Sequence, residues 1–256
     1  VQGWVARLYS RLQAGRLARF EARACRAAAH VVAVSPADRA ALLQIAPQAR
    51  IVVVPNGVDA HCYAPLDLPP NTRPTLVFTG RMDFRPNVDA VQWFCAEIWP
   101  RIRAALPEAL FRIVGRDPTP AVAALDREPG VEVVGAVADD RPYIGGADLY
   151  VLPMRFGGGI RLKLLQALAM ARAVVSTPLG AEGVEGLADG EHLALAEGAA
   201  AFAARAVELL GDPLARARLG QAGRALVIAG YDWEVLLPRF AAVLEGVGSW
   251  RLEVGS

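Results

Sequence analysis

Short apolar runs alternate with helical patterns along the central part of the chain. The predicted strands are Thr75–Thr79, Leu110–Val114, Val131–Val134, Leu149–Leu152, Val174–Thr177 and a short His192–Leu195. Helical patterns lie between them, over Asn87–Ala105, Ala121–Arg127, a brief stretch near Asp140, and Arg161–Ala171. Strands without polar alternation are typical of parallel sheets that are buried on both faces. We therefore predict an α/β fold with a Rossmann-like, doubly wound parallel sheet.

The two ends of the chain have a different pattern. Residues 4–29 form an arginine-rich helical pattern, and two short apolar runs, Val31–Val34 and Ile51–Val54, flank a helix over Pro36–Leu43. The stretch Ala64–Pro74 is rich in proline and polar residues, as is typical of a linker. Residues 199–247 are predicted to be helical throughout, with breaks near Gly211-Asp212-Pro213 and Gly230-Tyr231.

Composition narrows the class of protein. The chain is 54% hydrophobic and 21% charged, which is enough apolar material for a large core. Its net charge of +1 argues against nucleic acid as a partner. The three cysteines match no metal or disulfide pattern, and no apolar run reaches the roughly 20 residues of a membrane-spanning helix. We expect a cytoplasmic location, and a sequence that opens on Val1 inside a helical pattern suggests a fragment.

Candidate binding residues follow the predicted strands, because ligands of open parallel sheets bind at the carboxyl ends of the strands. Gly80 and Arg81 follow the first strand, where glycine allows close approach and arginine can grip phosphate oxygens. Gly157-Gly158-Gly159 leads into the predicted helix that carries Arg161 and Lys163. Backbone N–H groups at such a helix start suit a diphosphate, and cations there are unfavourable unless an anion is bound.

Lys163 stands out because it is the one lysine among 27 basic residues. A lysine kept in so arginine-rich a sequence suggests a need for a compact ammonium group, although chance is the alternative. Asn87, at the start of the predicted helix Asn87–Ala105, fits a ligand contact and a helix N-cap equally well. The sequence contains no P-loop motif and no G-x-G-x-x-G after the first strand, which argues against a P-loop NTPase and a dinucleotide dehydrogenase.

Taken in order, these segments resemble family 4 glycosyltransferases with the GT-B fold. The similarity extends from about Ala29 to Glu245. Pro86-Asn87, together with a lysine three residues before the usual glutamate, is similar to the pattern of exopolysaccharide-associated sugar transferases. The segments that carry it are Val54-Pro55-Asn56-Gly57-Val58-Asp59, Phe78-Thr79-Gly80-Arg81-Met82-Asp83, Ile113-Val114-Gly115-Arg116, Val133-Val134-Gly135-Ala136-Val137, the stretch Gly157–Ala169, Val174-Val175-Ser176-Thr177 and Gly180-Ala181-Glu182-Gly183.

The resemblance implies four parts of the chain. They are a remnant of the N-terminal acceptor domain (residues 1–54), a linker (55–74), a nucleotide-sugar-binding Rossmann-like domain (75–230) and a C-terminal helix that returns toward the N-terminal domain (231–256). It further implies transfer of a sugar, with retention, from a nucleotide-diphosphate donor to a glycan or lipid-linked acceptor, without a metal or another cofactor. A fragment of this kind is expected to be inactive alone.

The resemblance also assigns roles in donor binding. Arg81 and Lys163 would hold the diphosphate and stabilise the leaving group, and no other catalytic residue is expected in this chain. The backbone of Gly159 and Ile160 would assist, Arg116 and Val137 would flank the base, and position 166 would meet the ribose. The complete donor-binding prediction is Gly80, Arg81, Arg116, Val137, Gly157, Gly158, Gly159, Ile160, Arg161, Lys163 and Gln166.

The sequence departs from the family pattern at this site. Two glutamates separated by seven residues are usual, whereas this chain has Gly158 and Gln166 there. An uncharged glutamine bonds a ribose less strongly than a carboxylate does. Pro86 replaces a common lysine, for which Lys163 could substitute. Two alternatives therefore stay open, a non-catalytic nucleotide-sugar-binding or scaffold module and a GT-B nucleotide-sugar epimerase. The arginine-rich first helix allows contact with the inner membrane surface or a solvated face of the missing domain.

Overall fold

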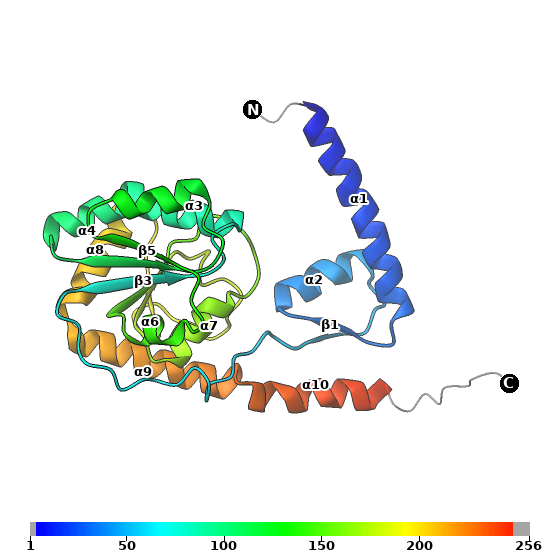
Figure 1. Cartoon of the computed structure of the whole chain (residues 1–256). Coiled ribbons are helices and arrows are strands. Elements are labelled where there is room, and N and C mark those ends of the chain that lie inside the picture. The colour runs from blue at the N-terminus through cyan, green and yellow to red at the C-terminus, as the bar shows by residue number, and fades with distance from the viewer. Residues whose placement is uncertain (1–3, 248–256) are drawn as a thin grey trace. The chain divides into compact units, whose positions relative to one another are not determined.

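A computed structural model describes residues 4–247 of the chain, with side chains over residues 13–245. It divides into two compact units. The described residues up to Asn56, together with those from Leu236 onward, form the smaller unit, and Gly57–Val235 form the larger one. Figure 1 traces the chain through both.

The smaller unit consists of helices and two short parallel strands. Helix α1 (Trp4–Ala27) is followed by β1 (Val31–Ala33), α2 (Pro36–Ile45) and β2 (Ile51–Val53), and most of α10 (Trp233–Val247) is grouped with them. Val31 pairs with Ile51 and Ala33 with Val53. Both strands end one residue earlier than predicted, at Ala33 and Val53.

The larger unit is built on a six-stranded parallel sheet with the order β5-β4-β3-β6-β7-β8. Its strands are β3 (Thr75–Thr79), β4 (Leu110–Val114), β5 (Val131–Gly135), β6 (Leu149–Leu152), β7 (Val174–Ser176) and β8 (Ala194–Leu195). The chain leaves β3 in one direction through β4 and β5, then returns to the other side of β3 with β6. This is the doubly wound, Rossmann-like arrangement that the sequence predicts.

Helices cover both faces of this sheet (Figure 1). The helical segments are α3 (Arg85–Trp93), a π-helical turn (Phe94–Ile98), α4 (Trp99–Ala105), α5 (Pro120–Ala123), a 3₁₀ turn (Ala124–Arg127), α6 (Arg141–Gly145), α7 (Leu162–Ala169), α8 (Ala199–Gly211) and α9 (Pro213–Gly230). Helices α4 and α8 pack together, as do α7 and α9. The inner strands β3, β6 and β7 are buried along their whole length, which explains why they lack polar alternation.

The predicted continuous helix over Asn87–Ala105 is interrupted in the structure. Five residues, Phe94–Ile98, form a π-helical turn between α3 and α4. Pro100 lies in the first turn of α4. It has no N–H and therefore cannot donate the hydrogen bond that a continuous α-helix would have at this position. The π turn also directs Phe94 into the core, 4.3 Å from Phe111 between ring centroids. An apolar pattern alone does not distinguish this wider turn from an α-helix.

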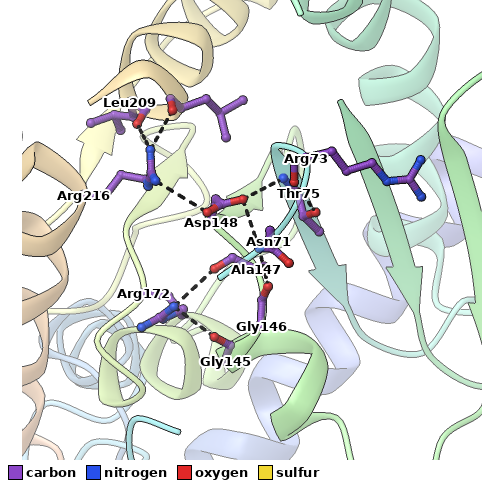
Figure 2. A network of polar contacts seen from close by, with 11 residues as sticks. Asn71, Arg73, Thr75, Gly145, Gly146, Ala147, Asp148, Arg172, Leu209 and Arg216 are labelled. Carbon is purple, nitrogen blue, oxygen red and sulfur yellow. Dashed lines mark hydrogen bonds and ion pairs between the residues drawn. The ribbon is translucent and has the colours of Figure 1, made fainter. Parts of the chain in front are cut away.

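Residues 57–74 of the predicted linker (55–74) belong to the larger unit, and the end of this segment, at Asn71, is attached at the amino end of the sheet (Figure 2). Asp148, just before β6, accepts hydrogen bonds from the Thr75 backbone at 2.9 Å and from Asn71 Nδ2 at 3.0 Å. Arg216 lies 3.5 Å from its other oxygen, and Arg172 donates to the carbonyls of Gly145 and Ala147. These contacts fix where β3 enters the sheet.

Candidate functional site

Two adjoining hollows open at the carboxyl ends of the parallel strands. One, of about 480 Å³, lies beside the start of α7, and we call it the α7 hollow. The other, of about 500 Å³, lies beyond β4 and β5, and we call it the β5 hollow. Four residues line both, so the hollows lie side by side: Thr79, Gly80, Arg81 and Asp140. Both hollows lie next to the end of β3, where the winding of the sheet reverses. This is the usual place for a ligand in such sheets.

Lys163 is the principal cation of the α7 hollow. Its Nζ donates a hydrogen bond to Asn87 Oδ1 at 2.8 Å and lies 4.0 Å from the centroid of the Phe78 ring. No carboxylate lies within 4 Å of this ammonium group among residues 13–245. Burial lowers the pKa of Lys163 to about 7, and the nearby charge of Arg161 contributes in the same direction. A bound anion would favour the charged form and occupy this hollow.

Asn87 positions that lysine rather than capping a helix. Asn87 lies within α3 and is buried, and the N-cap residue of this helix is Phe84. While Oδ1 accepts from Lys163, Nδ2 donates to the backbone carbonyl of Arg81 at 2.8 Å. The N-cap interpretation is therefore wrong, because Phe84 holds that position. The side chain of Asn87 instead links the loop after β3 to the ammonium group of Lys163.

Two glycines allow the loops after β3 and β4 to approach each other and the ammonium group of Lys163 closely. Gly80 has a φ of 147°, and a Cβ there would lie 2.5 Å from Lys163 Nζ. At Gly115, with a φ of 153°, a Cβ would lie 1.7 Å from the carbonyl oxygen of Gly80. A side chain at either position would push apart the loops that form both hollows.

Arg81 lines both hollows but is already paired. Its Nε donates to Asp83 Oδ1 at 3.1 Å, a second guanidinium nitrogen bonds the other oxygen of Asp83, and Asp117 lies 3.9 Å away. The pairing lowers the pKa of the Asp83 carboxyl, with the hydrogen bond from Arg81 as the main cause. Arg116 lines the β5 hollow, 3.7 Å from Asp117. A diphosphate would have to compete with carboxylates for these two arginines, whereas it would meet no competing carboxylate at Lys163 among residues 13–245.

The glycine-rich loop closes on itself. Arg161 is the N-cap residue of α7, and its guanidinium donates to the carbonyls of Gly158 and Gly157, both at 2.7 Å. Its buried Nε has no hydrogen-bond partner among the described residues, and burial lowers the Arg161 pKa. None of the five predicted loop residues lines either of the two hollows: Gly157, Gly158, Gly159, Ile160 and Arg161. Their contact with a diphosphate stays a prediction.

The other predicted positions lie at the hollows, together with two residues that the sequence did not single out. Gln166 lines the α7 hollow, and Val137 lines the β5 hollow. Beside Val137, Tyr63 donates a hydrogen bond from its hydroxyl to Asp140 Oδ1 at 3.3 Å. Burial raises the pKa of the half-buried Asp140 carboxyl and raises that of Tyr63 to about 12. The signal for Asp140 was available, because an acidic pair follows the predicted strand Val131–Val134.

Comparison with known proteins identifies the family. The sequence pattern of the family described as "Glycosyl transferases group 1" matches residues 73–212, which is more than half of the chain. That of "Glycosyltransferase Family 4" matches residues 3–61. The chain is therefore a member of the group 1 glycosyltransferase family. Its six-stranded parallel sheet agrees with the GT-B glycosyltransferases among its structural neighbours.

Two curated relatives are mannosyltransferases. A "Phosphatidyl-myo-inositol mannosyltransferase" of Mycolicibacterium smegmatis is 30% identical over 79% of this chain and 54% of its own length. A "GDP-mannose-dependent monoacylated alpha-(1-6)-phosphatidylinositol monomannoside mannosyltransferase" of Corynebacterium glutamicum is 28% identical over 68% of this chain and 48% of its own. The chain thus spans about half the length of these relatives.

Solved structures share the fold at lower identity. Sucrose-phosphate synthase from Thermosynechococcus elongatus has a TM-score of 0.70 and 22% identity, covering 87% of this chain and 59% of that one. HepE from Anabaena, solved in complex with UDP, has a TM-score of 0.70 and 17% identity, covering 87% and 65%. Among the described residues, no helix has the length and hydrophobicity that a membrane span requires, and no three side chains of His, Cys, Asp or Glu are grouped so that they could hold a metal ion.

Proposed function

We propose that the two hollows bind the nucleoside diphosphate of a nucleotide-sugar donor. The observation that carries this proposal is Lys163, a cation in the α7 hollow that has one neutral hydrogen-bond partner and no carboxylate within 4 Å among the residues with described side chains. Burying an unpaired charge is costly unless an anion compensates it. A diphosphate at the start of α7 would supply two or more negative charges and would also suit the positive end of the helix.

The nucleoside would extend from the diphosphate into the β5 hollow. This hollow combines apolar positions such as Ala136 and Val137 with the exposed guanidinium of Arg116, surroundings that suit a planar base. The named ligands of relatives support a donor of this class. HepE was solved with UDP-glucose, and the Corynebacterium relative is named as GDP-mannose-dependent. Because these two names differ in the base, the tests below use both uridine and guanosine nucleotides.

For the whole protein we propose transfer of the sugar, with retention, to a glycan or lipid-linked acceptor. Lys163, and Arg81 once its pair with Asp83 opens, would stabilise negative charge on the departing diphosphate. Both mannosyltransferases have a phosphatidylinositol in their names, which favours a lipid-linked acceptor. Contact of the arginine-rich α1 with an anionic membrane would bring the enzyme to such an acceptor. The anomeric proton signals of donor and product, measured by NMR, test retention.

Calorimetric titration of this chain with GDP, UDP and inorganic phosphate tests donor binding directly. We expect one nucleoside diphosphate to bind, and phosphate alone to bind weakly. Lys163→Ala removes a charge-assisted contact with the diphosphate, so we expect its affinity to fall about 30- to 100-fold.

Arg127→Ala is the matched control, because this exposed arginine has no ion pair or side-chain hydrogen bond among residues 13–245. Its affinity should equal that of the unmodified chain. If folded Lys163→Ala binds nucleotide as tightly as Arg127→Ala does, the proposed diphosphate contact is wrong.

The second candidate function is a nucleotide-sugar-binding module without catalysis. Gly158 and Gln166 favour it, because neither position carries the carboxylate usual in the family that the sequence resembles. Tight binding of a nucleotide sugar, with neither hydrolysis nor transfer to lipid or glycan acceptors, would support this alternative over the enzyme.

A further inference from the structure

We propose that Arg155 and Asp89 are positioning residues for the bound diphosphate. Their ion pair holds the connection between β6 and α7 (residues 153–161) against helix α3, and so fixes where Lys163 stands in the α7 hollow. This inference rests on the proposed function, since it requires a diphosphate at Lys163. Neither Arg155 nor Asp89 lines the α7 hollow or the β5 hollow, so the pair acts through its neighbours and not by touching the nucleotide.

The pair is more firmly held than the other arginine pair near the site. Arg155 donates from Nε to Asp89 Oδ2 at 2.9 Å, and a second guanidinium nitrogen bonds Oδ1, so one guanidinium binds both oxygens. Its Cζ also lies 5.2 Å from the centroid of the buried Trp93 ring. The Asp89 side chain is 23% exposed. Arg81 and Asp83 belong to one loop, whereas this pair joins residues 66 positions apart.

The connection between β6 and α7 needs such a contact because its centre has no side chains to pack. It contains three successive glycines, Gly157–Gly159, and the first and last of them have φ values of 98° and 80°, a region that glycine enters freely. Two contacts before the glycines reach α3. One is the pair of Arg155 with Asp89, and the other is the Phe156 ring, 5.4 Å from Cζ of Arg85.

Helix α3 also makes a contact on the other side of the glycines. Its Asn87 accepts a hydrogen bond from Lys163 Nζ at 2.8 Å and donates one to the Arg81 carbonyl, also at 2.8 Å. Asp89 lies two positions further along the same helix. The helix is thus joined to the chain at Arg155 before the glycines and at Lys163 after them. A diphosphate that contacts Lys163 and Arg81 together needs these two cations at a fixed separation.

Arg155 could also act at a distance, as a positive charge that attracts the diphosphate. The two mechanisms differ in what they predict for its partner. If only charge matters, loss of Arg155 lowers the affinity for a diphosphate, and loss of the Asp89 carboxylate raises it. If the pair positions the site, the loss of either residue lowers the affinity.

Calorimetric titration of GDP and UDP into Arg155→Met, Asp89→Asn and the double variant distinguishes the two mechanisms. Methionine keeps a long unbranched side chain beside Trp93, and asparagine keeps the shape of aspartate. We expect each single variant to lose about fivefold in affinity for the nucleoside diphosphate that the unmodified chain prefers. The double variant should lose no more than the weaker-binding single variant, because the two residues act as one unit.

Arg112→Met is the matched control. Arg112 also forms an ion pair through Nε, which donates to Glu132 Oε2 at 2.9 Å, and neither of these residues lines the two hollows. Its nucleotide affinity should equal that of the unmodified chain. Urea denaturation of every variant gives the second readout, since a merely structural pair would change the free energy of unfolding and leave the affinity of the folded protein unchanged.

Arg155→Lys is the second variant, and it serves if Arg155→Met fails to fold. Lysine keeps the positive charge but lacks the planar fork that binds both carboxylate oxygens at once. The affinity should therefore still fall if the pair positions the site, and it should stay unchanged if only charge matters.

The outcomes separate this inference from the proposed function. A higher affinity in Asp89→Asn would overturn the positioning role, and so would an unchanged affinity in both single variants. In either case, nucleotide binding by the unmodified chain would leave the proposed function standing. If neither GDP nor UDP binds the unmodified chain, both the positioning role and the proposed function are wrong.

Discussion

The two ends of the parallel sheet treat buried charge in opposite ways. At the amino end, the Asp148 carboxylate is shared among Thr75, Asn71 and Arg216 (Figure 2). At the carboxyl end, Lys163 has the neutral amide of Asn87 and an aromatic ring. Matched groups of the first kind hold a fold together, because each buried charge or amide has its partner within the protein. An unmatched cation is better explained by a ligand that supplies the missing charge.

The same contrast appears among the arginines. Arg172 and Arg216 at the amino end donate to backbone carbonyls, which are fixed in place by the sheet and by the end of α8. Arg81 at the carboxyl end pairs with the exposed carboxylate of Asp83. An exposed pair of this kind is weak and readily exchanged for phosphate oxygens. The arginines at the amino end are therefore bonded to fixed backbone groups, whereas the exposed pair at the carboxyl end is one that a phosphate could replace.

The largest effect is expected from Asp148→Ala. The substitution leaves the Thr75 N–H without its acceptor and removes the carboxylate that lies beside the guanidinium of Arg216 in a partly buried site. We expect the free energy of unfolding to fall by about 3 kcal/mol, measured by urea denaturation. Asp126→Ala is the control, because this exposed carboxylate accepts one backbone hydrogen bond, from Val133. Equal losses in the two variants would show that the network in Figure 2 adds no stability.

A pH dependence of stability should follow from Lys163, with the next largest effect. Its folded-state pKa of about 7 is far below the value of about 10.4 in an unfolded chain. Between these values the unfolded chain binds more protons, so the free energy of unfolding should rise with pH in this window. Below pH 7 both states are charged, and the cost of burying the charge is constant.

Urea denaturation of the unmodified chain and of Lys163→Met, at pH 7 and pH 9, measures this effect. The difference between the two proteins should shift by about 2 kcal/mol in favour of the unmodified chain. Contributions of other groups that titrate in this range cancel in the comparison. Parallel stability profiles would mean that Lys163 is fully charged and well solvated in the folded state.

The smallest effect concerns the release of Arg81. Asp83→Asn removes the carboxylate that pairs with Arg81, leaving the guanidinium available to a diphosphate. We expect the affinity for the preferred nucleoside diphosphate to rise about threefold in calorimetry, because exposed ion pairs contribute little. The midpoint of thermal unfolding should not change. A large loss of affinity would instead assign Asp83 a direct part in nucleotide binding.

Much of the fold was predictable, because the core strands are short apolar runs bounded by turn residues. The predicted bounds of β3, β4 and β6 agree with the structure to the residue. The edge strand β8 is shorter than predicted, with two residues in place of four. The π turn at Phe94–Ile98 was missed, since its apolar pattern is also that of an α-helix.

The candidate site was predictable to a different degree. Residues that directly follow a strand or begin a helix, such as Gly80, Arg81 and Lys163, lie at the hollows as expected. The loop Gly157–Gly159 does not line them. Arg161 donates to the carbonyls of Gly157 and Gly158, and no local pattern indicates that contact. Tyr63 reaches the site from a segment predicted as linker, and its partner Asp140 is 77 positions away in the chain.

The sequence by itself determined the strands, their parallel arrangement and the end of the sheet at which a ligand is predicted to bind. These features depend on local patterns, namely apolar runs, glycine turns and helix starts. Only the tertiary structure decided which charges are matched. Lys163 meets Asn87 across 76 positions, and Asp148 meets Arg216 across 68. Such partners come together because parallel strands align their ends in space, and the balance of charge at each end of the sheet is set there.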